Sequence, residues 1–90
     1  MPHAPSDPLL VAFANVLRRR RRAAGLTQEE LAHRAGVSIR YVSLLESRRH
    51  MPSLATLKGL ADGLEVSLAE LMGEVEAEMR ETGSRATGEG

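Results

Sequence analysis

Residues 27–46 read TQEELAHRAGVSIRYVSLLE, and this stretch decides the fold. Thr27 and Glu30 have the spacing of a capping box, in which each side chain bonds to a free backbone N–H in the first turn of a helix. This spacing predicts a short helix that ends at about residue 35, before Gly36. Ser38 is a suitable N-cap for a second short helix that runs to about residue 46. The stretch therefore predicts two short capped helices joined across a glycine turn.

The flanking sequence continues the helical pattern. Apolar residues recur every three or four positions from Leu9 to Val75, and no alternating run of β-branched and aromatic residues predicts a strand. Capping signals predict three more helices, which begin after Asp7, Ser53 and Ser67 and end at about Gly25, Ala61 and Glu81. We therefore expect an all-α fold, a compact five-helix bundle over residues 8–81, with an N-terminal arm at 1–7 and a flexible tail at 82–90.

Composition limits the class of protein. The chain has 90 residues and no cysteine, so it has room for one small core and no disulfide framework or zinc ribbon. No apolar run approaches the roughly 18 residues that span a bilayer, and no signal peptide opens the chain. We expect a cytoplasmic protein without a membrane partner. His33 and His50 are not spaced as a metal pair and no catalytic constellation is recognisable, so we expect no enzyme, metal or cofactor.

The formal net charge of zero hides an asymmetry along the chain. Residues 1–58 hold ten basic and four acidic groups, whereas residues 59–90 hold two basic and eight acidic groups. A net charge of zero therefore does not exclude a nucleic-acid surface on the first part. We interpret this charge distribution as two opposed charged surfaces, with the acids of the last helix turned away from any nucleic acid.

The order and spacing of motifs from Leu17 to Met72 resemble one known family. The segments GLTQEELA, GVS…YVS.LE and PSLATLKGLADGLEVSLAELM are similar to those of the Cro and phage-repressor type (XRE) helix-turn-helix family. Phage repressors, restriction-modification controller proteins and small antitoxins all share this pattern. The resemblance implies that the helix after Ser38 lies in the major groove of DNA, while the helix after Thr27 braces it across the backbone.

A helical wheel of the proposed recognition helix tests this implication. Val42 and Leu45 define its buried side, and the outward positions coincide with the family's base-reading positions: Ile39, Arg40, Ser43 and Leu44. Arg40 has a planar fork that can bond O6 and N7 of guanine, although a solvated helix arginine is the plainer alternative. Ile39 and Leu44 offer only apolar contact with thymine methyl groups, and Leu44 is equally well suited to packing against a neighbouring loop. Ser43 can contact either a base or a phosphate and discriminates little between bases.

Several residues are candidates for phosphate contact. Thr27, Gln28 and Ser38 lie at helix starts, where free N–H groups and the positive end of the helix dipole attract an anion. Capping alone also explains Thr27 and Ser38, whereas Gln28 matches the family's phosphate-contacting glutamine. Arg48, Arg49 and His50 lie in a loop that approaches phosphate in the family, and Arg49 and His50 are the candidates there.

A run of five arginines ends the first predicted helix. Because consecutive residues cover every direction around a helix, these arginines cannot all face DNA. Arg20 stands where the family has an aliphatic residue, so we expect its stem to pack and its head to reach water. The resemblance pairs Arg21 with Glu46 and also gives Arg21 a phosphate contact. Arg48 occupies a place usually held by glycine, which predicts a strained left-handed backbone there.

The family usually binds paired half-sites as a two-fold dimer. On the last helix, Met72, Val75 and Met79 form an apolar stripe that we interpret as a dimer seam, with packing over Leu9 and Leu10 of the same chain as the alternative. Together these features predict a sequence-specific regulator of transcription that binds double-stranded DNA as a homodimer, most simply a repressor or autoregulator. The alternative is an interaction module that binds a protein partner, similar to an antitoxin or a coactivator-like adaptor.

Overall fold

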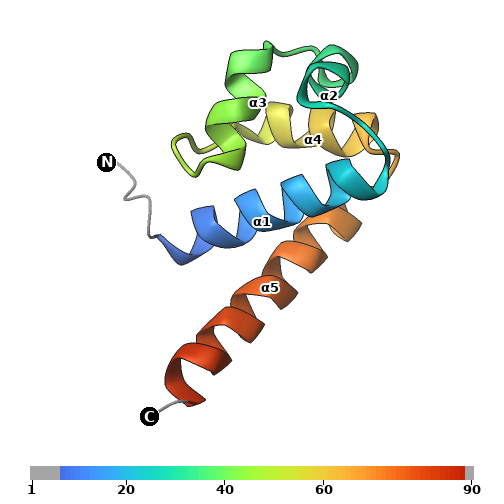
Figure 1. Ribbon diagram of the computed structural model, residues 1–90. Coiled ribbons are helices and arrows are strands. Elements are labelled where there is room, and N and C mark those ends of the chain that lie inside the picture. The colour runs from blue at the N-terminus through green and yellow to red at the C-terminus, as the bar shows by residue number, and fades with distance from the viewer. Residues whose placement is uncertain (1–6, 89–90) are drawn as a thin grey trace.

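Five helices and no strand make up the part of the chain that the computed structural model describes, residues 7–88, with side chains described to residue 81 (Figure 1). They are α1 (Pro8–Ala23), α2 (Gln28–Ala35), α3 (Ile39–Glu46), α4 (Leu54–Gly63) and α5 (Leu68–Gly88). The all-α prediction and the helix-turn-helix formed by α2 and α3 are confirmed. The predicted arm at 1–7 lies outside the described residues except for Asp7.

The predicted helix starts are confirmed by their caps. Thr27 Oγ1 accepts a bond from the backbone N–H of Glu30 at 3.0 Å, and Glu30 Oε1 accepts one from the N–H of Thr27 at 2.8 Å. This bond to the Thr27 N–H holds the pKa of the Glu30 carboxyl below its ordinary value. The other four starts are capped by side-chain oxygens of Asp7, Ser38, Ser53 and Ser67.

Two helix ends differ from the prediction. α4 ends at Gly63 rather than at about Ala61, and α5 continues to Gly88, well beyond Glu81. The part of the predicted tail at 82–88 is therefore helical, because the Gly, Ser and Thr residues that suggested an end lower helix propensity without forbidding a helix.

The ends of α1 to α4 share one capping geometry. In each, a residue at the cap or directly after it has a positive φ, and the N–H of the next residue bonds to a carbonyl five residues back, as in a Schellman motif. Glycine takes the left-handed position at Gly25 and Gly36, where φ is 73° and 75°. Arg48 and Glu65 take it after α3 and α4, with φ of 64° and 59°. The predicted strain at Arg48 is confirmed, and Glu65 is a second case that the sequence did not indicate.

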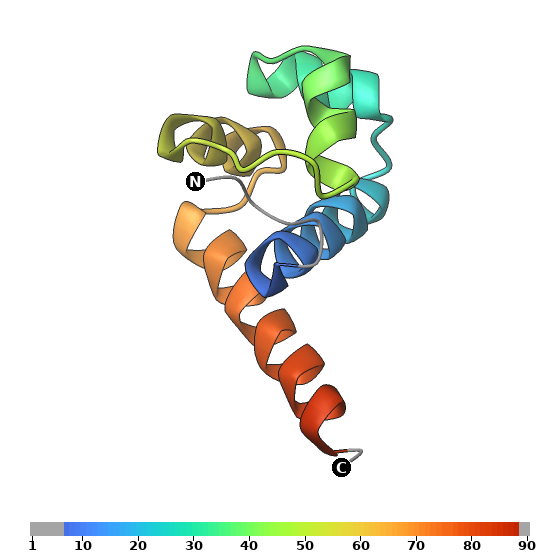
Figure 2. The ribbon, with the colours of Figure 1, turned by 90° about the vertical axis from the view of Figure 1, so that its left-hand side faces the viewer.

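Helix α1 is the centre of the bundle. It crosses between α5 on one side and the α2–α4 group on the other, as both views show (Figures 1 and 2). The largest fully buried side chains come from all five helices: Leu10, Val16 and Leu17 of α1, Leu31 of α2, Val42 and Leu45 of α3, Leu60 of α4, and Leu71 and Val75 of α5. One continuous core therefore fixes α3 relative to α1.

The burial of Val75 corrects the predicted dimer seam. Its side chain has no exposed area and belongs to the core of a single chain, so it is not available to a second copy. Met72 and Met79 are half-buried and pack against the same core. The apolar stripe of α5 is thus largely an intrachain contact with α1, which is the alternative that the sequence left open.

Ion pairs between α1 and α5 correct the interpretation of two opposed charged surfaces. Arg20 Nε lies 2.6 Å from Glu74 Oε1, so the head of Arg20 reaches a carboxylate rather than open water. This hydrogen bond raises the pKa of the Arg20 guanidinium above its ordinary value. Arg19 lies 3.3 Å from Glu78 and 3.7 Å from Glu74. The acids of α5 therefore partly neutralise the arginine run, because the two helices are neighbours in the fold.

The strained cap at Glu65 gives a direct test of the fold. We expect Glu65→Gly to raise the free energy of unfolding by about 0.5–1 kcal/mol, because glycine adopts a left-handed φ without a Cβ clash but gains freedom in the unfolded chain. Urea denaturation measures this change. Glu65→Ala is the matched control: it keeps the strain and removes the same carboxylate, so equal stability of the two variants would contradict a strained backbone.

Candidate nucleic-acid interface

The exposed side of α3 carries most of the predicted base-reading residues. Val42 and Leu45 are buried as the helical wheel predicts, while Ile39, Arg40 and Ser43 are exposed. Ile39 is 46% exposed, so its side chain is available for apolar contact with a ligand. Leu44 is half-buried, so it is only partly available for contact with a ligand.

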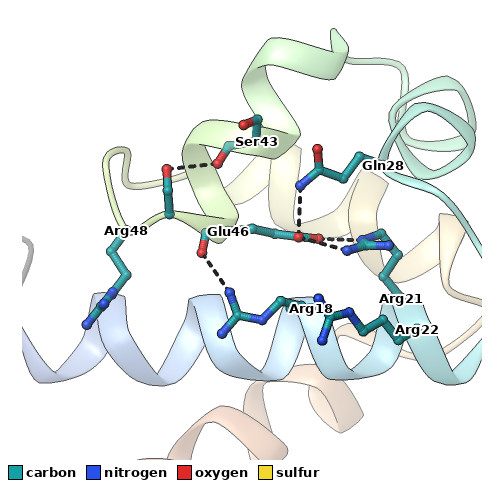
Figure 3. Close-up of a pocket in the computed structure, with 8 residues that line it drawn as sticks. Arg18, Arg21, Arg22, Gln28, Ser43, Glu46 and Arg48 are labelled. Atoms are coloured by element: carbon teal, nitrogen blue, oxygen red, sulfur yellow. Dashed lines mark hydrogen bonds and ion pairs between the residues drawn. The ribbon is translucent and has the colours of Figure 1, made fainter.

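A buried ionic cluster joins α3 to α1 and α2. Arg21 Nε lies 2.6 Å from Glu46 Oε2, and Arg21 Nη2 donates to Glu46 Oε1 at 3.0 Å, which makes the pair bidentate (Figure 3). Gln28 Nε2 donates to the same Oε1 at 3.0 Å. The side chains of Arg21 and Glu46 are only 11% and 4% exposed. The predicted structural pair is confirmed, and Gln28 adds a third helix to it.

The cluster keeps Glu46 ionised. Burial alone would raise the pKa of the Glu46 carboxyl, but the hydrogen bonds from Arg21 and Gln28 and the charge of Arg21 outweigh burial and lower it. The hydrogen bond between Arg21 and Glu46 also raises the pKa of the Arg21 guanidinium above its ordinary value. Folding is therefore linked to an ionised Glu46 at neutral pH.

The bonds that Arg21 makes inside the chain leave little of its guanidinium for the predicted phosphate contact. Besides its two bonds to Glu46, its Nη1 donates to the carbonyl oxygen of Leu26 at 2.8 Å. A guanidinium that is nearly buried and bonded on three nitrogen atoms presents little to an outside anion. We therefore assign Arg21 a structural role only.

Of the remaining candidates for phosphate contact, Gln28 is half-buried and donates to Glu46, and the others lie at the surface in two groups. Thr27 and Ser38 are exposed at the starts of α2 and α3, where each hydroxyl oxygen accepts a capping bond and keeps its own O–H free to donate. Arg49 and His50 are exposed in the loop between α3 and α4. The ring of His50 meets Tyr41 edge to face, with centroids 4.9 Å apart, which ties this loop to α3.

The structure also brings together basic residues that the sequence did not place beside one another. A surface pocket, called the basic pocket below, is lined by Arg18, Arg21, Arg22, Gln28, Ser43, Glu46, Ser47 and Arg48 (Figure 3). Arg18 and Arg22 are four residues apart on α1, so the i,i+4 spacing was the signal that marked them as one face. No local signal placed Arg48 beside them, because that contact depends on how α3 packs on α1.

Comparison with known proteins identifies this arrangement. The helix-turn-helix model matches residues 17–71, which is more than half of the chain. The chain belongs to the XRE-type helix-turn-helix family. In the terms of this family, α3 is the recognition helix and α2 is the helix that supports it.

Relatives and solved structures agree with this assignment. An uncharacterised HTH-type transcriptional regulator of Sinorhizobium fredii is 50% identical over 54 residues, which are 60% of this chain and 70% of that protein. The clp gene regulator ClgR from Corynebacterium glutamicum superposes with a TM-score of 0.82 at 30% identity over 88% of this chain and 84% of that one. The restriction-modification controller protein C.Esp1396I, solved as a tetramer with its natural 35-base-pair operator, has a TM-score of 0.74 at 28% identity over 79% and 93%.

Two other kinds of site are absent from the described part of this helix-turn-helix chain. No group of three or more histidine, aspartate or glutamate residues there is placed to hold a metal ion. None of the described helices is long and apolar enough to cross a membrane.

The buried cluster predicts a specific pH dependence. Because the pKa of Glu46 is lower in the folded chain than in the unfolded chain, its stabilisation is fully present above its ordinary value of 4.5 and is lost as the pH falls through the folded value. We expect Glu46→Gln to lower the free energy of unfolding at pH 7 by about 2 kcal/mol, because it leaves the Arg21 charge buried without its partner. Urea denaturation between pH 7 and 3 measures both effects.

The matched control for this experiment is Glu76→Gln, which changes an exposed carboxylate of α5. We expect the stability of the control to follow that of the wild type with pH, whereas Glu46→Gln has a flatter profile below pH 4.5. Parallel profiles for the wild type and Glu46→Gln would show that Glu46 is not the linked group.

Proposed function

We propose that the chain is a sequence-specific transcriptional regulator that binds paired half-sites on double-stranded DNA as a two-fold homodimer. The observation that carries the proposal is the exposed side of α3, which the buried Arg21–Glu46–Gln28 cluster and the core hold in one orientation. A rigid helix with exposed polar and apolar side chains suits the major groove, where bases present distinct edges.

Within this proposal, Arg40 is the main base-reading residue. Its side chain is exposed and can form a bidentate pair with guanine. Ile39 and the exposed part of Leu44 contact thymine methyl groups, and Ser43 contacts a base or phosphate. Thr27, Gln28, Ser38, Arg49 and His50 position the duplex through its phosphates, which set the register of the protein without reading sequence.

Two observations support the homodimer: the half-buried Met72 and Met79 on α5, and the self-association of a similar protein. C.Esp1396I binds its operator as a tetramer, so self-association on DNA is known for a protein with this fold. In this chain, Met72 lines an apolar cleft together with Leu9, Phe13, Met51, Pro52 and Leu57. Met72 and Met79 remain our proposed contacts with a second copy, whereas Val75 does not. Concentration-dependent dimerisation would then control occupancy of the operator.

Repression by occupying promoter DNA is the simplest mode of action, and it places the working protein on the nucleoid in the cytoplasm. Activation would need a contact with polymerase that none of these features indicates. The comparisons do not favour the alternative of an interaction module for a protein partner, because the relatives are described as transcriptional regulators.

Base reading by Arg40 is tested by selecting binding sites from a random duplex library. We expect Arg40→Ala to relax preference at one position in each half-site, with a loss of discrimination of about 1–3 kcal/mol there, while circular dichroism shows an unchanged fold. Arg80→Ala removes an exposed arginine from α5 and serves as the control for lost charge. An identical selected motif for Arg40→Ala and wild type would exclude the assigned role, and no enriched motif for the wild type would overturn the proposed function.

The dimer seam is tested by analytical ultracentrifugation. We expect Met79→Glu to give monomers that stay folded, because a charge at a half-buried position disfavours a dry contact between copies. Val75→Ala is the contrasting variant: we expect it to lower the free energy of unfolding by about 2 kcal/mol without changing the dimerisation constant. An unaltered dimer in Met79→Glu would place the seam elsewhere.

A further inference from the structure

We propose that the basic pocket seats one phosphate of the DNA backbone, held by Arg18, Arg22 and Arg48. This inference rests on the proposed function and adds three contacts to it. The resemblance gave no DNA contact to Arg18 or Arg22. It placed Arg48 only in the loop that approaches phosphate, at a position where the family usually has glycine.

The lining of the basic pocket carries more positive than negative charge. Four arginines line the pocket against one carboxylate, Glu46, whose two oxygens already accept bonds from Arg21 and Gln28. Among the described residues, no carboxylate pairs with Arg18, Arg22 or Arg48, whereas Arg19 and Arg20 on the other side of α1 pair with α5. The pocket therefore holds a positive excess that an anion from outside would neutralise.

The arginines of the basic pocket have N–H donors available for a ligand. To the described residues Arg18 makes two long bonds, from Nη1 to the carbonyl of Glu46 at 3.4 Å and from Nη2 to Asn15 Oδ1 at 3.3 Å. Arg22 and Arg48 are exposed. Figure 3 shows the Arg48 side chain descending from its loop toward α1, on which Arg18 and Arg22 stand. Guanidinium groups in such a cluster match the geometry of phosphate oxygens.

The basic pocket lies beside the exposed side of α3. Ser43 lies on the exposed side of α3 and also lines the pocket, so the pocket opens beside the proposed base-reading surface. With α3 in the major groove, the backbone along the groove edge passes close to that side of the protein. A phosphate in the pocket would fix how deeply and in which register α3 enters.

The backbone of Arg48 has a left-handed conformation. Its φ of 64° is a conformation that glycine adopts freely and that arginine adopts with strain. Strain kept at a residue whose side chain lines a charged pocket points to a role for that side chain in binding. Glu65 has the same kind of strain without lining the pocket, so the binding role of Arg48 must be tested by separating strain from side chain.

Arg48→Gly is the decisive variant, because removing the strained side chain should raise stability while removing a phosphate contact should weaken DNA binding. We expect Arg48→Gly to melt at a higher temperature than the wild type and to bind a selected operator about five-fold more weakly near 0.15 M salt, as expected for one lost phosphate contact. The slope of log affinity against log salt should become shallower by about 0.9, and the preferred base sequence should not change.

Matched controls separate this result from general effects. Glu65→Gly relieves the same kind of strain after α4, away from the basic pocket, so it should raise the melting temperature and leave DNA affinity and salt slope unchanged. Arg80→Gln removes a positive charge from exposed α5 and should also leave the slope unchanged. Arg22→Gln should weaken binding as Arg48→Gly does. Unchanged affinity and slope in both pocket variants, with the operator still bound by the wild type, would overturn the phosphate seat and leave the proposed function standing.

A second measurement distinguishes the source of the phosphate. We would titrate the wild type with tripolyphosphate and follow the arginine side-chain N–H signals by NMR. Shifts at Arg18, Arg22 and Arg48 only with duplex DNA, or with millimolar tripolyphosphate that the operator displaces, support the proposal. Tight binding of tripolyphosphate in a chain that binds no duplex would identify a free phosphate compound as the occupant and overturn both the DNA seat and the proposed function.

Discussion

The orientation of α3 depends on one buried interaction, the bidentate pair between Arg21 and Glu46. Glu46 is the last residue of α3, and its carboxylate is bonded by side chains from α1 and α2, so three helices meet at two oxygen atoms. Apolar packing alone permits small rotations of a two-turn helix, whereas two parallel hydrogen bonds fix both direction and distance. The exposed residues of α3 are therefore presented in a single geometry, which recognition of base edges requires.

Much of this architecture could be predicted from the sequence because its signals are local. Capping boxes, a glycine turn and the apolar spacing located five helices and their faces, and the strained position of Arg48 followed from the absence of glycine there. The errors arose where tertiary contacts decide. Val75 belongs to a stripe that suits either a second copy or α1, and only the packing of α5 on α1 chose between them.

The run of five arginines shows the same limit. As a sequence it is an undivided block of positive charge, but in the fold its members have three different surroundings. Arg19 and Arg20 pair with acids of α5, Arg21 is buried with Glu46, and Arg18 and Arg22 line the basic pocket. The direction of each side chain follows from helix phase, whereas its partner depends on which helix packs against that side.

The pairing of α1 with α5 also bears on how such a protein searches a chromosome. Non-specific affinity grows with the number of cations that displace counterions from DNA, and a regulator that binds everywhere too well is held away from its operator by competing sites. By pairing Arg19 and Arg20 with Glu74 and Glu78, the fold reduces the positive charge on the side of α1 that faces α5. Under the proposed function, these acidic residues of α5 would therefore lower background binding to DNA relative to operator binding.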